Sequence, residues 1–274
     1  MNRSLRVLAV IAAGLALLSG VGCSKLRARD QLNKGVQAYK NAKYEEAITH
    51  FQQAVELDPS LLNGRLYLAT AYAQQYIPGA DTEDNNRMAE QAIDQFKKVL
   101  DMKPGRDQQV GSLKGIASLY FNMKKLDQAK EYHKKVTELD PNDPEAYYSI
   151  GVIDWTEAYQ PRMEERAKLG MKPDEQLKDK KVCATLSAKS SDAIKDGIDN
   201  LNKALQLRPD YDDAMAYMNL MYREKADLEC TDPAGRAADL KTADEWVDKT
   251  LATKKEKAAK QPGAQGVTLD QPSK

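Results

Sequence analysis

The chain has 274 residues, with 41 Lys and Arg against 41 Asp and Glu, so its formal net charge is zero. This balance argues against a dedicated nucleic-acid binder, which usually carries net positive charge to neutralise phosphates. Charged residues make up 30% of the chain and apolar residues 42%, which suits a soluble core but not an integral membrane bundle. Three cysteines and two histidines are too few for Cys/His metal clusters.

The N-terminus has the pattern of an export signal. Arg3 and Arg6 precede an apolar stretch over residues 7–18, and the small residues 19–22 follow it. The apolar stretch is too short to span a bilayer as a helix. The order of basic, apolar and small segments is typical of a secretory signal. We therefore expect residues 1–22 to be a signal peptide and the rest of the chain to be exported.

The small residues that lead to Cys23 resemble the lipobox of bacterial lipoproteins, in which the cysteine is lipidated after cleavage. The two residues before Cys23 fit that pattern, whereas Gly20 stands where leucine is usual. The resemblance implies lipidation of Cys23 and a lipidated linker over residues 23–27. Because Ser24 follows instead of aspartate, it also implies a periplasm-facing lipoprotein of the bacterial outer membrane. Cleavage without lipidation stays open, and it would give a periplasmic or secreted protein.

A repeated helical pattern organises the rest of the chain. One apolar sequence pattern occurs four times. Its leading residues are three and four positions apart, on one helical face, and a proline follows at its end. The four copies begin at Ala47, Ala92, Ala129 and Gly197. Another helical pattern precedes each copy and carries a small residue that can face it: Gly35, Ala69, Ala117 and Gly151. Each unit is therefore predicted to be a closely packed pair of helices.

This spacing resembles the tetratricopeptide repeat, a helix-turn-helix unit of about 34 residues. Residues 28–61 and 110–143 fit its register without gaps, and a fifth, weaker unit starts near Asp212. The resemblance implies an all-α solenoid of about five helical hairpins over residues 28–252. Because this family serves many partners, the fold indicates a protein-binding scaffold without naming what it binds.

Three of the repeats carry extra residues between their two helices, near residues 77–87, 161–192 and 226–238. All three insertions lie at the same point of the unit, and such insertions project from one face of a solenoid. That face is either a contact surface or a row of tolerated, solvated loops. Residues 253–274 contain few apolar residues and several helix breakers, so we expect a disordered tail.

Cys183 and Cys230 lie in neighbouring insertions, one in each. In an oxidising, exported compartment the two thiols can form a disulfide that joins the insertions. The alternative is a pair of thiols too far apart to bridge, because a sequence does not give the Cα separation.

The sequence shows no catalytic, cofactor or metal motif. His50 and His133 lie in different repeats, away from any cysteine or serine motif, and we expect both to be packed or surface residues. Asp81, Glu83 and Asn85 alternate like the ligands of a calcium loop, but the turn glycine and closing glutamate are absent. No glycine-rich phosphate loop occurs. We therefore expect neither an enzyme nor a bound cofactor or metal.

In the tetratricopeptide family the first helices of the repeats line a concave groove. In that register two groove-facing positions are apolar or aromatic, one with Tyr39, Phe121 and Trp155 and the other with Leu32, Leu66 and Tyr148. Such a stripe can anchor a peptide or a partner helix, because rigid rings bury a large area at low entropic cost. The alternative role for these side chains is packing between repeats.

These patterns predict a membrane-anchored scaffold that mediates protein-protein interaction in the bacterial envelope. Its partners are expected to be proteins or peptides, with the membrane reached through the lipid anchor and no nucleic acid bound. Two alternatives stay open. One is a secreted, soluble interaction protein, and the other is an enzyme or ligand carrier that uses the long insertion, residues 161–192, as a lid.

Overall fold

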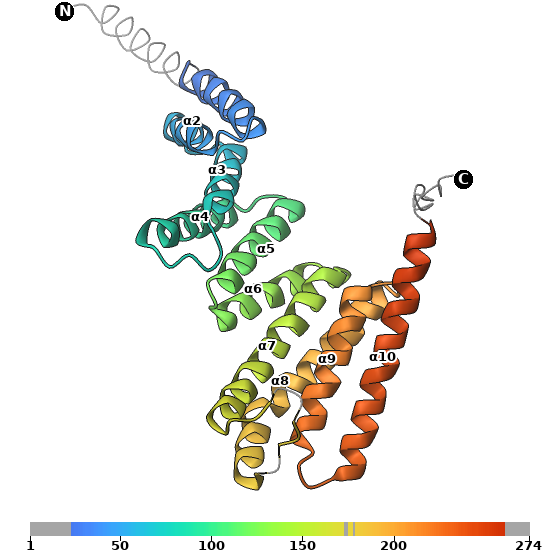
Figure 1. Ribbon diagram of the computed structural model, residues 1–274. Helices are drawn as coiled ribbons and strands as arrows, with labels where there is room; N and C mark the ends of the chain where they lie inside the picture. Colours follow the sequence, from blue (N-terminus) through green and yellow to red (C-terminus); the bar gives the residue numbers. More distant parts are fainter. Residues whose placement is uncertain (1–22, 173–174, 178, 261–274) are drawn as a thin grey trace, which may run out of the picture. The chain divides into compact units, whose positions relative to one another are not determined.

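The computed structural model describes residues 23–172, 175–177 and 179–260, and this part of the chain is built from helices without a strand (Figure 1). The predicted signal peptide, residues 1–22, lies outside the described residues. None of the described helices is long and apolar enough to cross a membrane. The helices follow one another as hairpins, which confirms the predicted all-α, tetratricopeptide-type fold. They form two compact units, which divide between Leu139 and Asp140.

The first unit contains three helix pairs. In chain order its helices are residues 23–40, α2 (Tyr44–Leu57), α3 (Leu62–Gln75), α4 (Glu83–Asp101), α5 (Arg106–Asn122) and α6 (Leu126–Leu139). Each helix from α2 to α5 packs on the helix before or after it, and α3 also contacts α5. The core of this unit gathers around the buried side chains of Phe51, Tyr72 and Phe96.

The second unit contains two pairs made of longer helices. They are α7 (Pro144–Lys168), α8 (Lys180–Leu207), α9 (Asp212–Leu228) and α10 (Pro233–Lys260). α7 packs on α8 and α9, α8 packs on α9, and α9 packs on α10. The core includes the buried side chains of Leu201, Met218 and Met221.

Small residues allow the paired helices to approach closely, as the sequence predicts. A Cβ atom added to Gly35 would lie 2.5 Å from the Phe51 ring, and one added to Gly151 would lie 2.6 Å from Cγ of Leu201. The same added atom on Gly151 would be 3.3 Å from the backbone oxygen of Gly197, so these two glycines do face each other. The alanines at the equivalent positions are fully buried: Ala47, Ala69, Ala92, Ala117 and Ala129.

The long insertion is mainly helical, so the alternative of a solvated loop does not hold for it. Residues 161–168 extend α7 past Pro161, and residues 180–192 form the first part of α8. Asp179 caps this extension, because its carboxylate accepts hydrogen bonds from the backbone N–H groups of Lys181 and Val182 at 2.8 and 3.1 Å. Most of the insertion near residues 226–238 likewise belongs to α9 and α10.

The helices extend beyond both predicted boundaries of the repeat region. Residues 23–27, predicted as a linker, are helical and continuous with the first repeat. Residues 253–260, predicted as the start of the tail, continue α10. Lys257 fixes this end, because its ammonium group lies 2.5 Å from the carboxylate of Asp212 on α9. The remaining tail, residues 261–274, lies outside the described residues.

Candidate protein-binding surface

Four of the six predicted groove residues lie on first helices of the first unit. Their side chains are all half-buried: Leu32 and Tyr39 on the helix of residues 23–40, Leu66 on α3 and Phe121 on α5. Three of them, Leu32, Tyr39 and Leu66, pack against the core of the unit. The Tyr39 ring also meets the Tyr44 ring edge-on, at 5.3 Å between centroids. Packing therefore uses part of each of these side chains and leaves part exposed.

The other two predicted groove residues belong to an aromatic cluster in the second unit. We use this name for five side chains: Tyr148, Trp155 and Tyr159 on α7, Tyr211 before α9, and Tyr217 on α9. Tyr148 lies 4.9 Å from Tyr211 and 5.6 Å from Tyr217 between ring centroids. Trp155 stacks on Tyr159 at 4.7 Å and meets Tyr217 edge-on at 5.5 Å. The first helices of both repeats thus share one aromatic surface.

The cluster keeps its polar hydrogens at neutral pH. Burial raises the pKa of Tyr211 to about 12 and also raises the pKa of Tyr148 and Tyr217 above the ordinary value. The indole N–H of Trp155 is buried and donates to no hydrogen-bond partner among the described residues. A buried donor without an acceptor is unfavourable, and because this nitrogen is closed off from the surface, a partner bound on the rings does not reach it. The surface therefore combines apolar ring area with neutral donors.

Sequence reasoning missed three members of the aromatic cluster. Tyr159 lies one helical turn after Trp155, and that spacing was a usable signal. Tyr211 precedes α9 and falls outside the first-helix register. Tyr217 follows Ala216, which occupies the position that corresponds to Tyr148 in the previous repeat. When the positions of one repeat are matched one by one to those of the next, the match to Tyr148 is therefore the small Ala216 and not the aromatic Tyr217 beside it.

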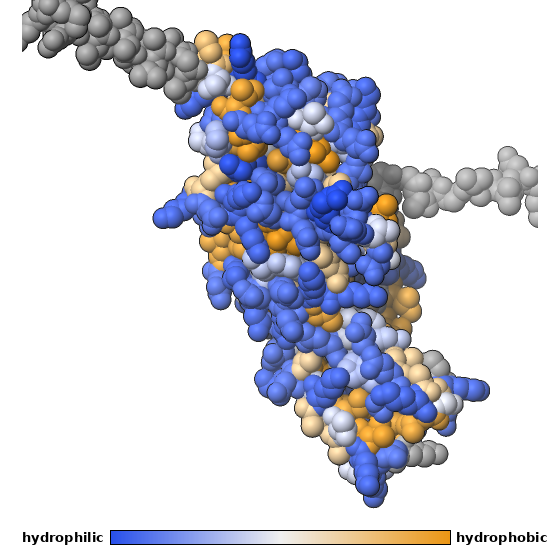
Figure 2. All heavy atoms as spheres, turned by 90° about the vertical axis from the view of Figure 1, so that its left-hand side faces the viewer, coloured by the Kyte–Doolittle hydropathy of each residue, from blue (hydrophilic) through white to orange (hydrophobic). Residues whose placement is uncertain are grey.

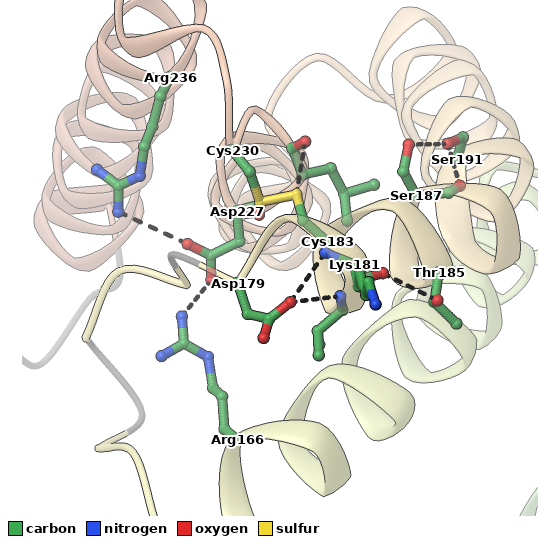
Figure 3. The surroundings of a disulfide bond; sticks show 12 residues. Arg166, Asp179, Lys181, Cys183, Thr185, Ser187, Ser191, Asp227, Cys230 and Arg236 are labelled. Carbon is green, nitrogen blue, oxygen red and sulfur yellow. Dashed lines mark hydrogen bonds and ion pairs between the residues drawn. A yellow bond between two sulfur atoms is a disulfide. The ribbon is translucent and has the colours of Figure 1, made fainter. Parts of the chain in front are cut away.

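A disulfide ties the long insertion to the turn between α9 and α10. Cys183 lies in the first turn of α8 and Cys230 just after α9, with Cα atoms 6.2 Å apart (Figure 3). This separation is within the usual range for disulfides. Leu177, Leu186 and Leu228 pack around the pair in a small apolar cluster. The structure thus brings together the two cysteines that the sequence places in neighbouring insertions.

A network of buried charges, here called the arginine clamp, lies beside the disulfide. It consists of Arg162 and Arg166 on α7, Glu224 and Asp227 on α9, and Arg236 on α10. Arg162 donates two hydrogen bonds to the Glu224 carboxylate at 2.5 and 2.7 Å and one to Asp227 at 2.9 Å. Arg166 donates to Asp227 at 2.9 Å and to the backbone oxygens of Lys172 and Glu175. Figure 3 shows Asp227 between Arg166 and Arg236.

The clamp and the disulfide argue against the insertion as a lid. The side chains of Arg166 and Glu224 are only 2% and 4% exposed, so the space beneath the insertion is filled. A nearby pocket of about 390 Å³ lies between α8 and α9. Two of its lining residues, Ser187 and Ser191, place their hydroxyl oxygens 3.2 Å apart (Figure 3), and no histidine occurs among the described residues that line it. The pocket therefore shows no serine-histidine pair for nucleophilic catalysis.

The insertion near residues 77–87 contains an ordered turn. The Asn85 side chain accepts a hydrogen bond from the Ile77 N–H at 2.7 Å and donates to the oxygens of Ile77 and Ala80 at 2.9 and 2.7 Å. Asn85 is thus occupied by the backbone and does not act as a calcium ligand. In the part of the chain that the structure describes, no group of three His, Cys, Asp or Glu side chains could hold a metal ion. Of the two histidines, His50 lies 2.7 Å from the Gln31 amide oxygen and His133 is buried.

Comparison with known proteins identifies the repeats. Two family models of the tetratricopeptide repeat match the chain, one over residues 28–61 and the other over residues 115–143. No curated protein sequence shows significant similarity to the chain.

Solved structures share the fold over most of the chain. A crystal structure of MamA protein is 14% identical with a TM-score of 0.56, and it covers 86% of this chain and 96% of its own. MamA from residue 41 to its end, from Desulfovibrio magneticus RS-1, is 16% identical with a TM-score of 0.55 and covers 84% of this chain and 96% of its own. At such identity the similarity establishes the fold of the helical hairpins alone.

Proposed function

Because the chain is a tetratricopeptide-repeat protein, we propose that it is a scaffold that binds protein or peptide partners through the first helices of its hairpins. The aromatic cluster carries this proposal. Large rigid rings at low entropic cost are typical of the residues that dominate binding energy at interfaces. The cluster is held in shape by ring-to-ring contacts, so little ordering is needed when a partner binds.

The expected partner segment has an apolar or aromatic side chain next to a backbone or side-chain oxygen. Its apolar group would cover the half-buried faces of Trp155 and Tyr217, and its oxygen would accept a hydrogen bond from a tyrosine hydroxyl of the cluster. The tyrosine hydroxyls can donate hydrogen bonds, because tyrosine is protonated at neutral pH even at its ordinary pKa near 10, and burial raises the pKa of Tyr148 and Tyr217 further. Recognition of this kind involves binding without catalysis.

The proposal includes an anchor at Cys23. In the structure Cys23 is a free, exposed cysteine and the first of the described residues, where the chain is already helical. We propose that it is lipidated after removal of residues 1–22, which would place the protein on the periplasmic side of the bacterial outer membrane. A disulfide between Cys183 and Cys230 agrees with an oxidising, exported compartment. The alternative is an unlipidated protein that is periplasmic or secreted.

A crosslinked pull-down from the cell envelope tests the binding face. We expect the Phe121→Ala, Trp155→Ala double variant to lose the partners that the wild-type chain retains, while Trp246→Ala keeps them. Trp246 is the matched control, because it is the other tryptophan of the second unit, is half-buried, and lies on α10, a second helix. Retention of every partner by the double variant would contradict the proposed face.

Membrane fractionation tests the anchor separately. Replacement of Cys23 by serine removes the thiol that would carry the lipid, so we expect the variant to move from the membrane to the soluble fraction. If Cys23→Ser stays with the membrane, the chain reaches the envelope in another way. Mass spectrometry of the wild-type N-terminus then shows whether any lipid is present.

A further inference from the structure

The described chain is helical from the proposed anchor onward, without a spacer between Cys23 and the first repeat. Residues 23–40 are helical from Cys23 onward, and Ala28 within them is fully buried in the first repeat. A lipid on Cys23 would therefore hold the first turn of a packed repeat at the depth of the lipid headgroups. A flexible linker, by contrast, would let the repeats move away from the bilayer. This inference rests on the proposed lipidation of Cys23.

The same turn exposes an apolar side chain. Leu26 is 71% exposed, the highest exposed fraction of any large apolar side chain among the described residues. It lies three residues after Cys23, so both side chains are on one face of the helix, away from the buried Ala28. Apolar atoms also reach the surface near the start of the described chain, among hydrophilic residues (Figure 2). Leu26 is not part of the core of the first unit.

Positive charge surrounds this side chain. Lys25, Arg27 and Arg29 are all exposed, and Asp30 is the one acid among residues 23–30. Asp30 is already paired, because its carboxylate lies 2.7 Å from the Lys34 ammonium group. Asp58, at the end of α2, has a lowered pKa mainly because the Ser60 hydroxyl donates a hydrogen bond to its carboxylate, and the positive charges of Lys25 and Arg29 lower it further. The local charge around Leu26 thus remains positive on a chain whose total charge is zero.

We propose that the first turn of this helix docks on a bilayer surface that contains anionic headgroups, with Leu26 immersed at the interface. A leucine side chain gains free energy when it leaves water for the boundary between headgroups and acyl chains. Each lysine or arginine close to an anionic surface raises the affinity by about fivefold. The lipid alone attaches the protein, and this contact sets the orientation of the first repeat against the membrane.

Depth-dependent fluorescence quenching tests the contact. The lipidated chain is reconstituted in vesicles of three parts phosphatidylethanolamine to one part phosphatidylglycerol, with a genetically encoded dansylated amino acid at position 26. The control carries the same probe at Gln37, an exposed position about 16 Å farther along the helix. Spin-labelled lipids should quench position 26 at least about twofold more than position 37. Equal quenching at the two positions would overturn the proposal.

Charge reversal tests the headgroup contribution. Arg27→Glu should lower quenching at position 26 in the anionic vesicles by about twofold or more, whereas Lys40→Glu, at the other end of the same helix, should leave it unchanged. No difference between these two variants would overturn the electrostatic part of the proposal.

The anchor and the docking can fail separately. If mass spectrometry finds Cys23 without lipid, a maleimide phospholipid is coupled to it in the chain of residues 23–274. Strong quenching at position 26 would then support docking although native lipidation is absent. A lipidated chain that shows equal quenching at positions 26 and 37 would be anchored but not docked.

Discussion

Replacement of Arg162 by methionine should destabilise the second unit by about 3–5 kcal/mol, because it leaves a buried carboxylate without its partner. Glu224 is 4% exposed and receives two hydrogen bonds from Arg162, at 2.5 and 2.7 Å. Asp227 loses one donor but retains Arg166 at 2.9 Å, so the cost falls mainly on Glu224. Methionine is apolar and of similar length, so loss of packing contributes little.

Urea denaturation followed by tryptophan fluorescence measures this cost. The chain has two tryptophans, and both Trp155 and Trp246 lie in the second unit, so the signal reports that unit selectively. Lys195→Met is the matched control, because Lys195 and Asp199 form an ion pair whose side chains are 76% and 65% exposed. Exposed pairs contribute at most about 1 kcal/mol.

A double variant separates the loss of the pair from the cost of an unpaired charge. Arg162→Met combined with Glu224→Met removes both charges, so we expect it to recover most of the stability lost by the single variant. A loss below about 1 kcal/mol in the single variant would refute the argument. Equal destabilisation by the single and double variants would refute it as well.

Three further predictions concern other parts of the chain. Non-reducing mass spectrometry should find Cys183 and Cys230 protected from alkylation, and free thiols in the wild-type chain would disprove the bridge. Cys230→Ser should lower the stability of the second unit by about 4 kcal/mol, because the bridge closes a loop of 47 residues. The pKa of Tyr211 is about 12 in the folded chain and near 10 in the unfolded chain, so the folded state retains a proton that the unfolded state loses. The urea midpoint should therefore fall as the pH rises above 10, and absorbance at 295 nm should show that Tyr211 ionises at a higher pH than free tyrosine. A midpoint that does not change from pH 9 to 11 would contradict this. Gly35→Ala should destabilise the first unit by about 1–3 kcal/mol, because the new Cβ would lie 2.5 Å from the Phe51 ring. The control is Gly111→Ala, whose Cβ would lie in open space, so thermal unfolding followed by circular dichroism should show unchanged or higher stability. Equal effects of the two substitutions would argue against close packing at Gly35.

The helix pairs were predictable because their signal is local. Small residues such as Gly151 recur at a fixed point of each unit, and apolar residues recur at helical spacing. Each pattern depends on a few neighbouring positions, so sequence alone reveals it. The structure confirms both the all-α class and the close contact between Gly151 and Gly197.

The arginine clamp was not predictable, because its partners are far apart in sequence. Arg162 and Glu224 are separated by 62 residues, and their pairing depends on the packing of α7 against α9. From the sequence alone, charged residues at these positions are expected to be exposed to solvent, although the fold buries them. The helical character of residues 253–260 was missed for a similar reason, since the contact between Lys257 and Asp212 joins two helices.

The aromatic cluster was predictable in part. Tyr148 and Trp155 were found because they occupy repeated positions of the register. Tyr217 was missed because the register in the last repeat points to the preceding residue, and only the three-dimensional contact of the rings reveals it.

Site-specific photocrosslinking in intact cells tests the central claim, that partners bind the aromatic cluster on the first helices. A photoreactive phenylalanine analogue would replace Tyr159 on α7 in one variant and Lys195, a highly exposed residue on α8, in another. We predict crosslinks from position 159 to an envelope protein and none to that protein from position 195. Crosslinks from position 195 with none from position 159 would contradict the account.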